Sequence, residues 1–226
     1  YNANAEIIDQ AAQRGIKIIV IDSDVNSSQV SCRIGTNNLQ AGIKAAEAAL
    51  ATDDEELYIG IVNYDVNSAN GQQRELGFRQ TVEQDPRVKN ITTINVLSTT
   101  EDARAGAKEM LLSDSRINVV VTFNEWTSLG VGWAIRDLNR ADRIQVVAFD
   151  SNVVSVGMLE TGEVDALIVQ NPYAMGYLGV ETAANLMNGQ TGGPSVVDTA
   201  TTIVTRENMY EPESQKILFS FEEEGY

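Results

Sequence analysis

Histidine is absent from the 226-residue sequence, and cysteine occurs only once. Without histidine, a Ser-His-Asp or Cys-His nucleophile pair cannot form, and the usual histidine-containing zinc and iron sites are excluded. The single cysteine, Cys32, allows no internal disulfide bond. Its neighbours, among them Val30 and Ile34, indicate a strand, so we expect a buried, unreactive thiol. The sequence offers little for catalysis, and we expect no metal and no cofactor.

Basic residues are scarce, and long apolar runs are absent. The chain has 16 Lys and Arg against 32 Asp and Glu, which gives a formal net charge of −16 at pH 7. This surplus repels phosphate backbones and anionic membrane surfaces, so nucleic acid is not expected as a direct partner. No run approaches the roughly 20 apolar residues that span a bilayer. The first residues, Tyr1 to Asn4, lack the charged and apolar regions of a signal peptide.

Apolar β-branched runs alternate with helical patterns along the whole chain. This alternation is typical of parallel sheets with crossover helices, and runs that are apolar throughout indicate strands covered on both faces. A helical pattern is present almost from the first residue, so we expect the chain to enter a fold already in progress. We predict strands at 18–21, 57–62, 91–97, 119–123, 144–149 and 166–170, helices at 3–14, 38–51, 71–84, 101–113, 125–139 and 172–188, and a strand or a crossover at 196–204.

The residues that end the predicted strands are mostly polar. In doubly wound sheets, ligands bind beyond the carboxyl ends of the strands. Carboxylates and carboxamides at that edge can accept hydrogen bonds from vicinal hydroxyls, and carboxamides can also donate to them, as recognition of a neutral polyol requires. The aromatic residues Trp126 and Phe149 lie next to them in sequence and offer flat apolar faces for a sugar ring. The polar strand-end residues are Asp22, Ser23, Asn124, Glu125, Asp150, Gln170 and Asn171.

Six fragments, in this order, resemble the ribose-binding-protein-like type I solute-binding proteins of bacterial sugar ABC transporters. Effector domains of the lactose-repressor class share the same core. The resemblance implies an α/β fold of two doubly wound parallel-sheet lobes joined by a three-strand hinge, with the first lobe incomplete. The fragments are Gly15 to Asp22, Gly35 to Asn38, Arg74 to Phe78, Phe123 to Glu125, Val147 to Asp150, and Gln170 to Pro172 followed by Gly179 to Ala183.

The resemblance also implies a set of ligand-binding residues. Phe149 matches an aromatic wall of the family, and Trp126 compensates for a second aromatic that is missing around 99–102. Ser23 stands where ribose-binding proteins have an arginine, which argues against ribose itself. The residues that match polar ligands of the sugar are Asp22, Arg74, Asn124, Asp150 and Gln170.

The same resemblance divides the chain into two lobes. Residues 1–36 with 172–198 are expected to form the remainder of the N-terminal lobe, and 38–170 with 199–226 the C-terminal lobe. The hinge is expected near Asn37, Asn171 and Thr199. Family members begin with two or more βα units before the helix at which this chain opens, so we expect the N-terminal part of the fold to be missing. Such a chain would expose a sheet edge.

Less specific roles are open for each candidate residue. Asp22 and Asp150 are also suited to cap the helices that follow them. Arg74 is also suited to a surface ion pair with Glu75 or with an acidic residue four positions away. The two carboxamides, Asn124 and Gln170, are also suited to satisfy backbone groups at strand ends, and Phe149 to fill the core.

The function implied is reversible binding of a small sugar, a pentose, hexose or related polyol, and its delivery to the membrane permease of an ABC importer. We expect a monomer in the periplasm or outside the cell, anchored as a lipoprotein in a Gram-positive bacterium. An enzyme is disfavoured, although Asp22 and Asp150 are the residue types of a glycosidase pair. Two alternatives stay open: the effector domain of a transcription regulator, which needs a helix-turn-helix upstream, and the extracellular sugar-sensor domain of a signalling receptor.

Overall fold

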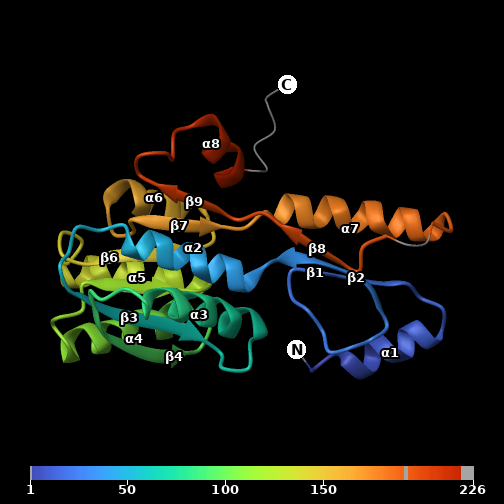
Figure 1. The fold of residues 1–226 in the computed structure, drawn as a ribbon, viewed down its shortest axis with the longest axis horizontal. Coiled ribbons are helices and arrows are strands. Elements are labelled where there is room, and N and C mark those ends of the chain that lie inside the picture. The colour runs from blue at the N-terminus through green and yellow to red at the C-terminus, as the bar shows by residue number, and fades with distance from the viewer. Residues whose placement is uncertain (1, 191–192, 220–226) are drawn as a thin grey trace. The chain divides into compact units, whose positions relative to one another are not determined.

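The computed structural model describes residues 2–190 and 193–219 (Figure 1). The chain divides into two compact units: unit 1 comprises Tyr1–Asn37 and Gln170–Thr201, and unit 2 comprises Asn38–Val169 and Thr202–Tyr226. The chain therefore passes between the units three times. The lobe boundaries predicted from the sequence lie within a few residues of these three crossings. That the two units are the lobes of a hinged protein remains a proposal.

Unit 2 contains a six-stranded sheet of β3 (Leu57–Tyr64), β4 (Val88–Val96), β5 (Val119–Thr122), β6 (Gln145–Phe149), β7 (Ala166–Val169) and β9 (Thr202–Thr205). The strand order is β4-β3-β5-β6-β7-β9. All neighbours are parallel except β7 and β9, which pair antiparallel with Ala166 opposite Thr205. The carboxyl ends of the parallel strands therefore share one edge of the sheet, where the predicted polar residues follow them.

Helices cover both faces of this sheet. One face packs against α2 (Asn38–Leu50) and α3 (Ala69–Val82) through a cluster that includes Ala45, Phe78 and Val121. The other packs through a second cluster, which includes Leu111 and Leu159, against α4 (Thr100–Ser113), α5 (Glu125–Leu138), α6 (Val153–Thr161) and α8 (Pro212–Leu218). The α/β class with a mainly parallel sheet is confirmed.

Unit 1 contains a smaller parallel sheet of β1 (Ile18–Ile21), β2 (Val30–Thr36) and β8 (Val196–Thr199), in the order β1-β2-β8. Its helices are α1 (Ala5–Gln13), which buries none of its residues, and α7 (Pro172–Met187), which buries only Met175. Met175 packs with Cys32 and Ile34 from β2. Cys32 is buried as expected, and desolvation raises the pKa of its thiol, which keeps the thiol protonated and unreactive.

Most predicted elements are present, with three differences. The strand expected around Cys32 is β2, and the structure adds α6 and α8 to the predicted set. The sequence of α6 is rich in valine, which favours strands, but Asn152 and Ser155 form a capping box that begins a helix there. The stretch 196–204, expected to be one strand or a crossover, forms β8 in unit 1 and β9 in unit 2.

Candidate functional site

The predicted binding residues form two sets, one in each unit. Six of the eight lie at the carboxyl end of a strand or within two residues after it, as the sequence predicts. Arg74 lies in α3, and Trp126 lies in the first turn of α5. Unit 1 carries Asp22, Ser23 and Gln170, and unit 2 carries Arg74, Asn124, Trp126, Phe149 and Asp150.

Asp22 and Asp150 share an unusual backbone conformation. Their φ angles are 62° and 67°, and among the described non-glycine residues only Asn139 also has a positive φ. The Asp22 N–H donates to Ile34 O at 2.9 Å, and the Asp150 N–H donates to Ile168 O at 3.1 Å. Each aspartate thus extends the hydrogen-bonded ladder by one residue before the chain turns. Strained conformations of this kind cost about 1–3 kcal/mol and cluster at functional sites.

Helix capping does not explain these two aspartates. Asn152, not Asp150, caps α6, and its side chain accepts from the N–H groups of Val154 and Ser155. No helix follows Asp22 directly, because the next element is β2. The capping alternative is therefore wrong for both residues. The Ser23 hydroxyl donates to Asp22 Oδ2 at 3.3 Å, so these two predicted residues are in contact.

The Arg74 guanidinium is buried in unit 2, with 2% of the residue exposed. Its Nε donates to Asn38 Oδ1 at 2.8 Å, and its Nη1 donates to Phe123 O at 2.7 Å. The guanidinium carbon lies 4.7 Å from the centre of the Phe149 ring, within range of a cation–π interaction. Arg74 therefore ties together α3, the beginning of α2 and the end of β5.

A surface ion pair with Glu75 does not account for Arg74. Glu75 instead pairs with Arg79 at 2.8 Å, so this alternative is wrong. The contacts of Arg74 are those of a positioning residue, and direct donation to a sugar by Arg74 stays a prediction.

Two glycines bring α3 close enough to α2 for these contacts. A Cβ atom at Gly42 of α2 would lie 2.0 Å from Arg74 O, and one at Gly77 of α3 would lie 2.1 Å from Leu39 O. No side chain fits at either position without moving a helix. The two helices therefore touch through their backbones at the turns that carry Asn38 and Arg74.

The two predicted aromatic residues differ in exposure. Phe149 is fully buried and packs edge-to-face on Phe123 at 5.8 Å between ring centres, so the core alternative describes it. Because Phe149 has no exposed face, we assign it a supporting role: its ring packs against the Arg74 guanidinium and does not form a wall of the sugar site. Trp126 is 49% exposed, so its ring is open to solvent.

Asn124 holds the turn between β5 and α5. Its Oδ1 accepts from the Thr127 N–H at 2.9 Å, as a helix cap, and its Nδ2 donates to Ser98 Oγ at 2.7 Å. Asn124 thus satisfies a backbone group, which was the alternative to ligand binding. The buried Ser128 Oγ lies 2.7 Å from Asn124 O and accepts from the Phe149 N–H at 2.9 Å. This hydroxyl fixes the ends of β5 and β6 relative to each other.

The three predicted hinge residues also lie in unit 1. Asn37 Nδ2 donates to Asp198 Oδ2 at 3.1 Å, and Asn171 caps α7 by accepting from the Ala174 N–H at 2.9 Å. Thr199 is buried at the end of β8. The chain changes unit after Asn37, before Gln170 and after Thr201, so a hinge near these residues stays a proposal.

Gln170, the remaining predicted ligand, lies in unit 1. Its Oε1 accepts from the Thr36 hydroxyl at 2.8 Å. Sequence reasoning did not assign roles to Thr36, Asn38 or Ser128. Thr36 and Asn38 both lie within the fragment Gly35 to Asn38 that carried the resemblance, and that position was the available signal. Ser128 had none, because a serine four residues into a helix has no distinctive pattern.

Two kinds of feature are absent among the described residues. Among the described residues, no three His, Cys, Asp or Glu side chains are grouped so that they could hold a metal ion. None of the described helices has the length and apolar content needed to cross a membrane.

A family model described as "periplasmic binding protein domain" matches residues 1–191. Among curated proteins, the D-ribose/D-allose-binding protein of Pseudomonas aeruginosa is 25% identical over 211 residues, covering 88% of this chain and 65% of its own length. A ribose import binding protein of Haemophilus influenzae is 25% identical and is covered over 61% of its length. The chain thus spans less than two thirds of these relatives.

Solved structures give the same result. A carbohydrate transporter solute-binding protein from Agrobacterium radiobacter, in complex with D-arabinose, superposes with a TM-score of 0.91 at 28% identity, covering 96% of this chain and 75% of that one. The periplasmic component of a sugar transport system from Hahella chejuensis superposes with a TM-score of 0.85 at 29% identity, covering 90% and 74%. The chain belongs to the periplasmic binding protein domain family.

Proposed function

We propose that the protein binds a small sugar reversibly, a pentose, hexose or related polyol, and delivers it to the membrane permease of an ABC importer. The observation that carries this proposal is the matched pair of strand-end aspartates, Asp22 in unit 1 and Asp150 in unit 2, both held in a left-handed conformation. Their carboxylates accept hydrogen bonds from sugar hydroxyls. Because each unit supplies one such group, a sugar bound by both draws the units together.

The chemistry of the surrounding residues suits a neutral polyol. Hydroxyl and carboxamide groups of Ser23, Asn124 and Gln170 both donate and accept, which matches the dual character of a sugar hydroxyl. The exposed ring of Trp126 offers an apolar face to C–H groups. A net charge of −16 does not repel an uncharged ligand.

The relatives support this proposal through what their names and complexes state. The Pseudomonas aeruginosa relative is a D-ribose/D-allose-binding protein, and the Agrobacterium radiobacter structure holds D-arabinose. Ser23 at the position of the ribose-binding arginine argues for a sugar other than ribose.

The remaining parts of the proposal follow from the same function. Binding without chemical change needs no catalytic group, so we propose a protein that is not an enzyme. It works as a monomer in the periplasm or outside the cell, anchored as a lipoprotein if the source is Gram-positive. The units move about a hinge near Asn37, Asn171 and Thr199.

The test is calorimetric titration of the protein with D-ribose, D-allose, D-arabinose, D-galactose and D-fucose. We expect heat of binding with at least one of them. Absence of heat with every one would refute the proposal.

The variant Asp150→Gly separates a binding role from a structural one. Glycine adopts the positive φ of Asp150 without strain, so folding stability should change by no more than about 1 kcal/mol. Loss of a charged hydrogen-bond acceptor worth about 1.5–3 kcal/mol should weaken sugar binding by roughly 10-fold to 100-fold. Asn139→Gly is the matched control, because Asn139 also has a positive φ but ends α5. Unchanged affinity in Asp150→Gly would remove Asp150 from the site.

A further inference from the structure

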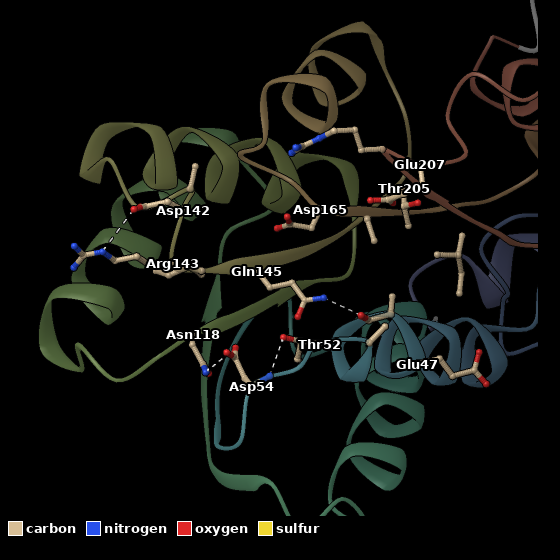
Figure 2. A pocket seen from close by; sticks show the side chains of 17 residues that line it. Glu47, Thr52, Asp54, Asn118, Asp142, Arg143, Gln145, Asp165, Thr205 and Glu207 are labelled. Atoms are coloured by element: carbon tan, nitrogen blue, oxygen red, sulfur yellow. Dashed lines mark hydrogen bonds and ion pairs between the residues drawn. The ribbon is translucent and has the colours of Figure 1, made fainter.

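Unit 2 has a cavity at the edge of its sheet opposite the candidate sugar site. The cavity has a volume of about 720 Å³ and is shown in Figure 2. It lies at the amino ends of β5, β6 and β7, beside the last turn of α2 and the end of β9. Every residue that lines it belongs to unit 2. The cavity is therefore separate from the strand-end residues to which sugar binding is assigned.

A buried acceptor without a partner faces this cavity. Gln145 Oε1 and Thr199 Oγ1 are the two buried side-chain polar atoms, within the described part of the chain, that make no hydrogen bond. Gln145 Nε2 donates to Ala48 O at 2.9 Å. In Figure 2 a dashed line from the labelled Gln145 marks this bond. Turning the amide over would set two oxygens against each other, so this orientation is fixed. A buried carbonyl oxygen left unpaired costs about 1–3 kcal/mol, which a ligand that donates a hydrogen bond there would recover.

Most amide N–H groups of the cavity wall are already used. Asn118 Nδ2 donates to Glu56 O at 2.8 Å and to Asp54 Oδ2 at 3.2 Å, and Asn118 Oδ1 accepts from the Tyr58 N–H at 2.9 Å. Gln145 Nε2 is bound to Ala48 O. Both N–H groups of Asn118 Nδ2 and one of the two N–H groups of Gln145 Nε2 are therefore used, whereas Gln145 Oε1 is left as an unpaired acceptor.

Carboxylates outnumber guanidinium groups around the cavity. Asp165 Oδ2 accepts from the Val146 N–H at 2.7 Å. Of the two guanidinium groups, Arg206 donates to Leu159 O, and Arg143 is paired with Asp142 at 3.9 Å. The cavity therefore carries an excess of negative charge. The carboxylates are those of Glu47, Asp54, Asp142, Asp165 and Glu207.

Burial leaves Asp165 short of positive charge. Desolvation raises the pKa of its carboxyl group, although Arg206 acts in the opposite direction. A cation in the cavity would compensate for this burial. It would also satisfy the neighbouring acceptors.

The cavity suits an organic cation better than a metal ion. Within the described residues, no group of three acidic, His or Cys side chains is placed to hold a metal. Besides the threonines Thr52 and Thr205, the cavity has an aliphatic lining that includes Ala48, Ala51, Ala166 and Ile203. We propose that this cavity binds a small organic ammonium ion, a primary amine whose N–H groups donate to Gln145 Oε1 and Asp165 and whose short alkyl chain lies on the alanine and isoleucine side chains.

The test uses n-butylammonium chloride as the probe, titrated calorimetrically at constant ionic strength. 1-Butanol is the neutral control of equal shape, and calcium chloride is the metal control. We expect saturable binding of n-butylammonium and no binding of 1-butanol. Equal binding of the alcohol, preference for calcium, or no saturable binding of the amine would each overturn the proposal.

Matched variants place the probe in the cavity. Asp165→Asn keeps an oxygen to accept from the Val146 N–H but removes the charge, and should weaken amine binding by about tenfold. Glu109→Gln removes an exposed carboxylate of α4 that does not line the cavity and should leave affinity unchanged. Equal affinity of Asp165→Asn and the unmodified protein would place the amine elsewhere and refute the assignment. Sugar titrations on both variants should match the unmodified protein, so failure here is distinguishable from failure of the sugar proposal.

Discussion

Replacement of Gly77 by alanine should destabilise unit 2 and loosen Arg74. The new Cβ would lie 2.1 Å from Leu39 O and 3.1 Å from Leu39 C, both of which are backbone atoms of α2. Carbon and oxygen atoms that are not bonded normally stay more than about 3 Å apart, so α3 must move away from α2 by roughly 1 Å. That movement stretches the bond from Arg74 Nε to Asn38 Oδ1, which crosses the same helix contact.

The size of the effect follows from two opposing contributions. Overpacking a tight contact costs about 1–3 kcal/mol, and more where only backbone can yield, as it is here. Alanine returns about 1 kcal/mol because it favours the helix more than glycine does. Loss of the buried hydrogen bond from Arg74 adds about 1.5–3 kcal/mol, because its donor is charged. We expect a net loss of about 2–4 kcal/mol in the free energy of unfolding, in line with these contributions.

The assay is urea unfolding followed by far-ultraviolet circular dichroism, with Gly157→Ala as the matched control. Gly157 also lies inside a helix, α6, but a Cβ atom there would meet nothing within 4 Å. Gly157→Ala should therefore stabilise the protein by up to about 1 kcal/mol. Opposite signs for the two variants are the expected result. Stabilisation by Gly77→Ala, or a shared sign, would refute the tight helix contact.

Two further changes test the supports around the site. Ser128→Ala should lower the free energy of unfolding by about 2–3 kcal/mol, measured by urea unfolding. The reason is that the buried hydroxyl contacts Asn124 O, Thr122 Oγ1 and the Phe149 backbone. A loss below about 0.5 kcal/mol, the size of an ordinary surface effect, would contradict this. Hydrogen bonds from Arg104 and Lys108 lower the pKa of Asp137 to about 2. Its charged form is therefore favoured by folding, so the stabilisation is complete above the unfolded pKa near 4 and is lost as pH falls through about 2. Urea unfolding at a series of pH values tests this. Asp137→Asn should be less stable than the unmodified protein at pH 6, and most of the difference should be lost as the pH falls to about 2. A difference in stability that does not change with pH would argue against the ion pair.

The sequence predicts the fold well because the signal for buried parallel strands is strong. Continuous runs such as Val119 to Phe123 leave no polar face, so they specify burial on both sides of a sheet. The helix α6 escaped prediction because its valines favour strands, and only the capping box at Asn152 decides the outcome. Local propensity and capping disagree there, and capping prevails.

The site is predictable only in part. The order of residues places Asp22, Asn124, Asp150 and Gln170 at strand ends, since a strand-end position is a property of the local sequence. The burial of Arg74 was not predictable, because it depends on two glycines that let α2 and α3 touch at backbone distance. The side-chain partner that Arg74 finds, Asn38, is 36 residues away in the chain.

The most direct test of the central proposal is a crystal structure of the protein with the sugar that gives the largest heat in calorimetry. The proposal predicts one sugar molecule with hydroxyl groups within hydrogen-bond distance of both carboxylates, Asp22 from unit 1 and Asp150 from unit 2. A sugar that contacts only one of these aspartates, or that lies away from the carboxyl ends of the strands, would contradict it.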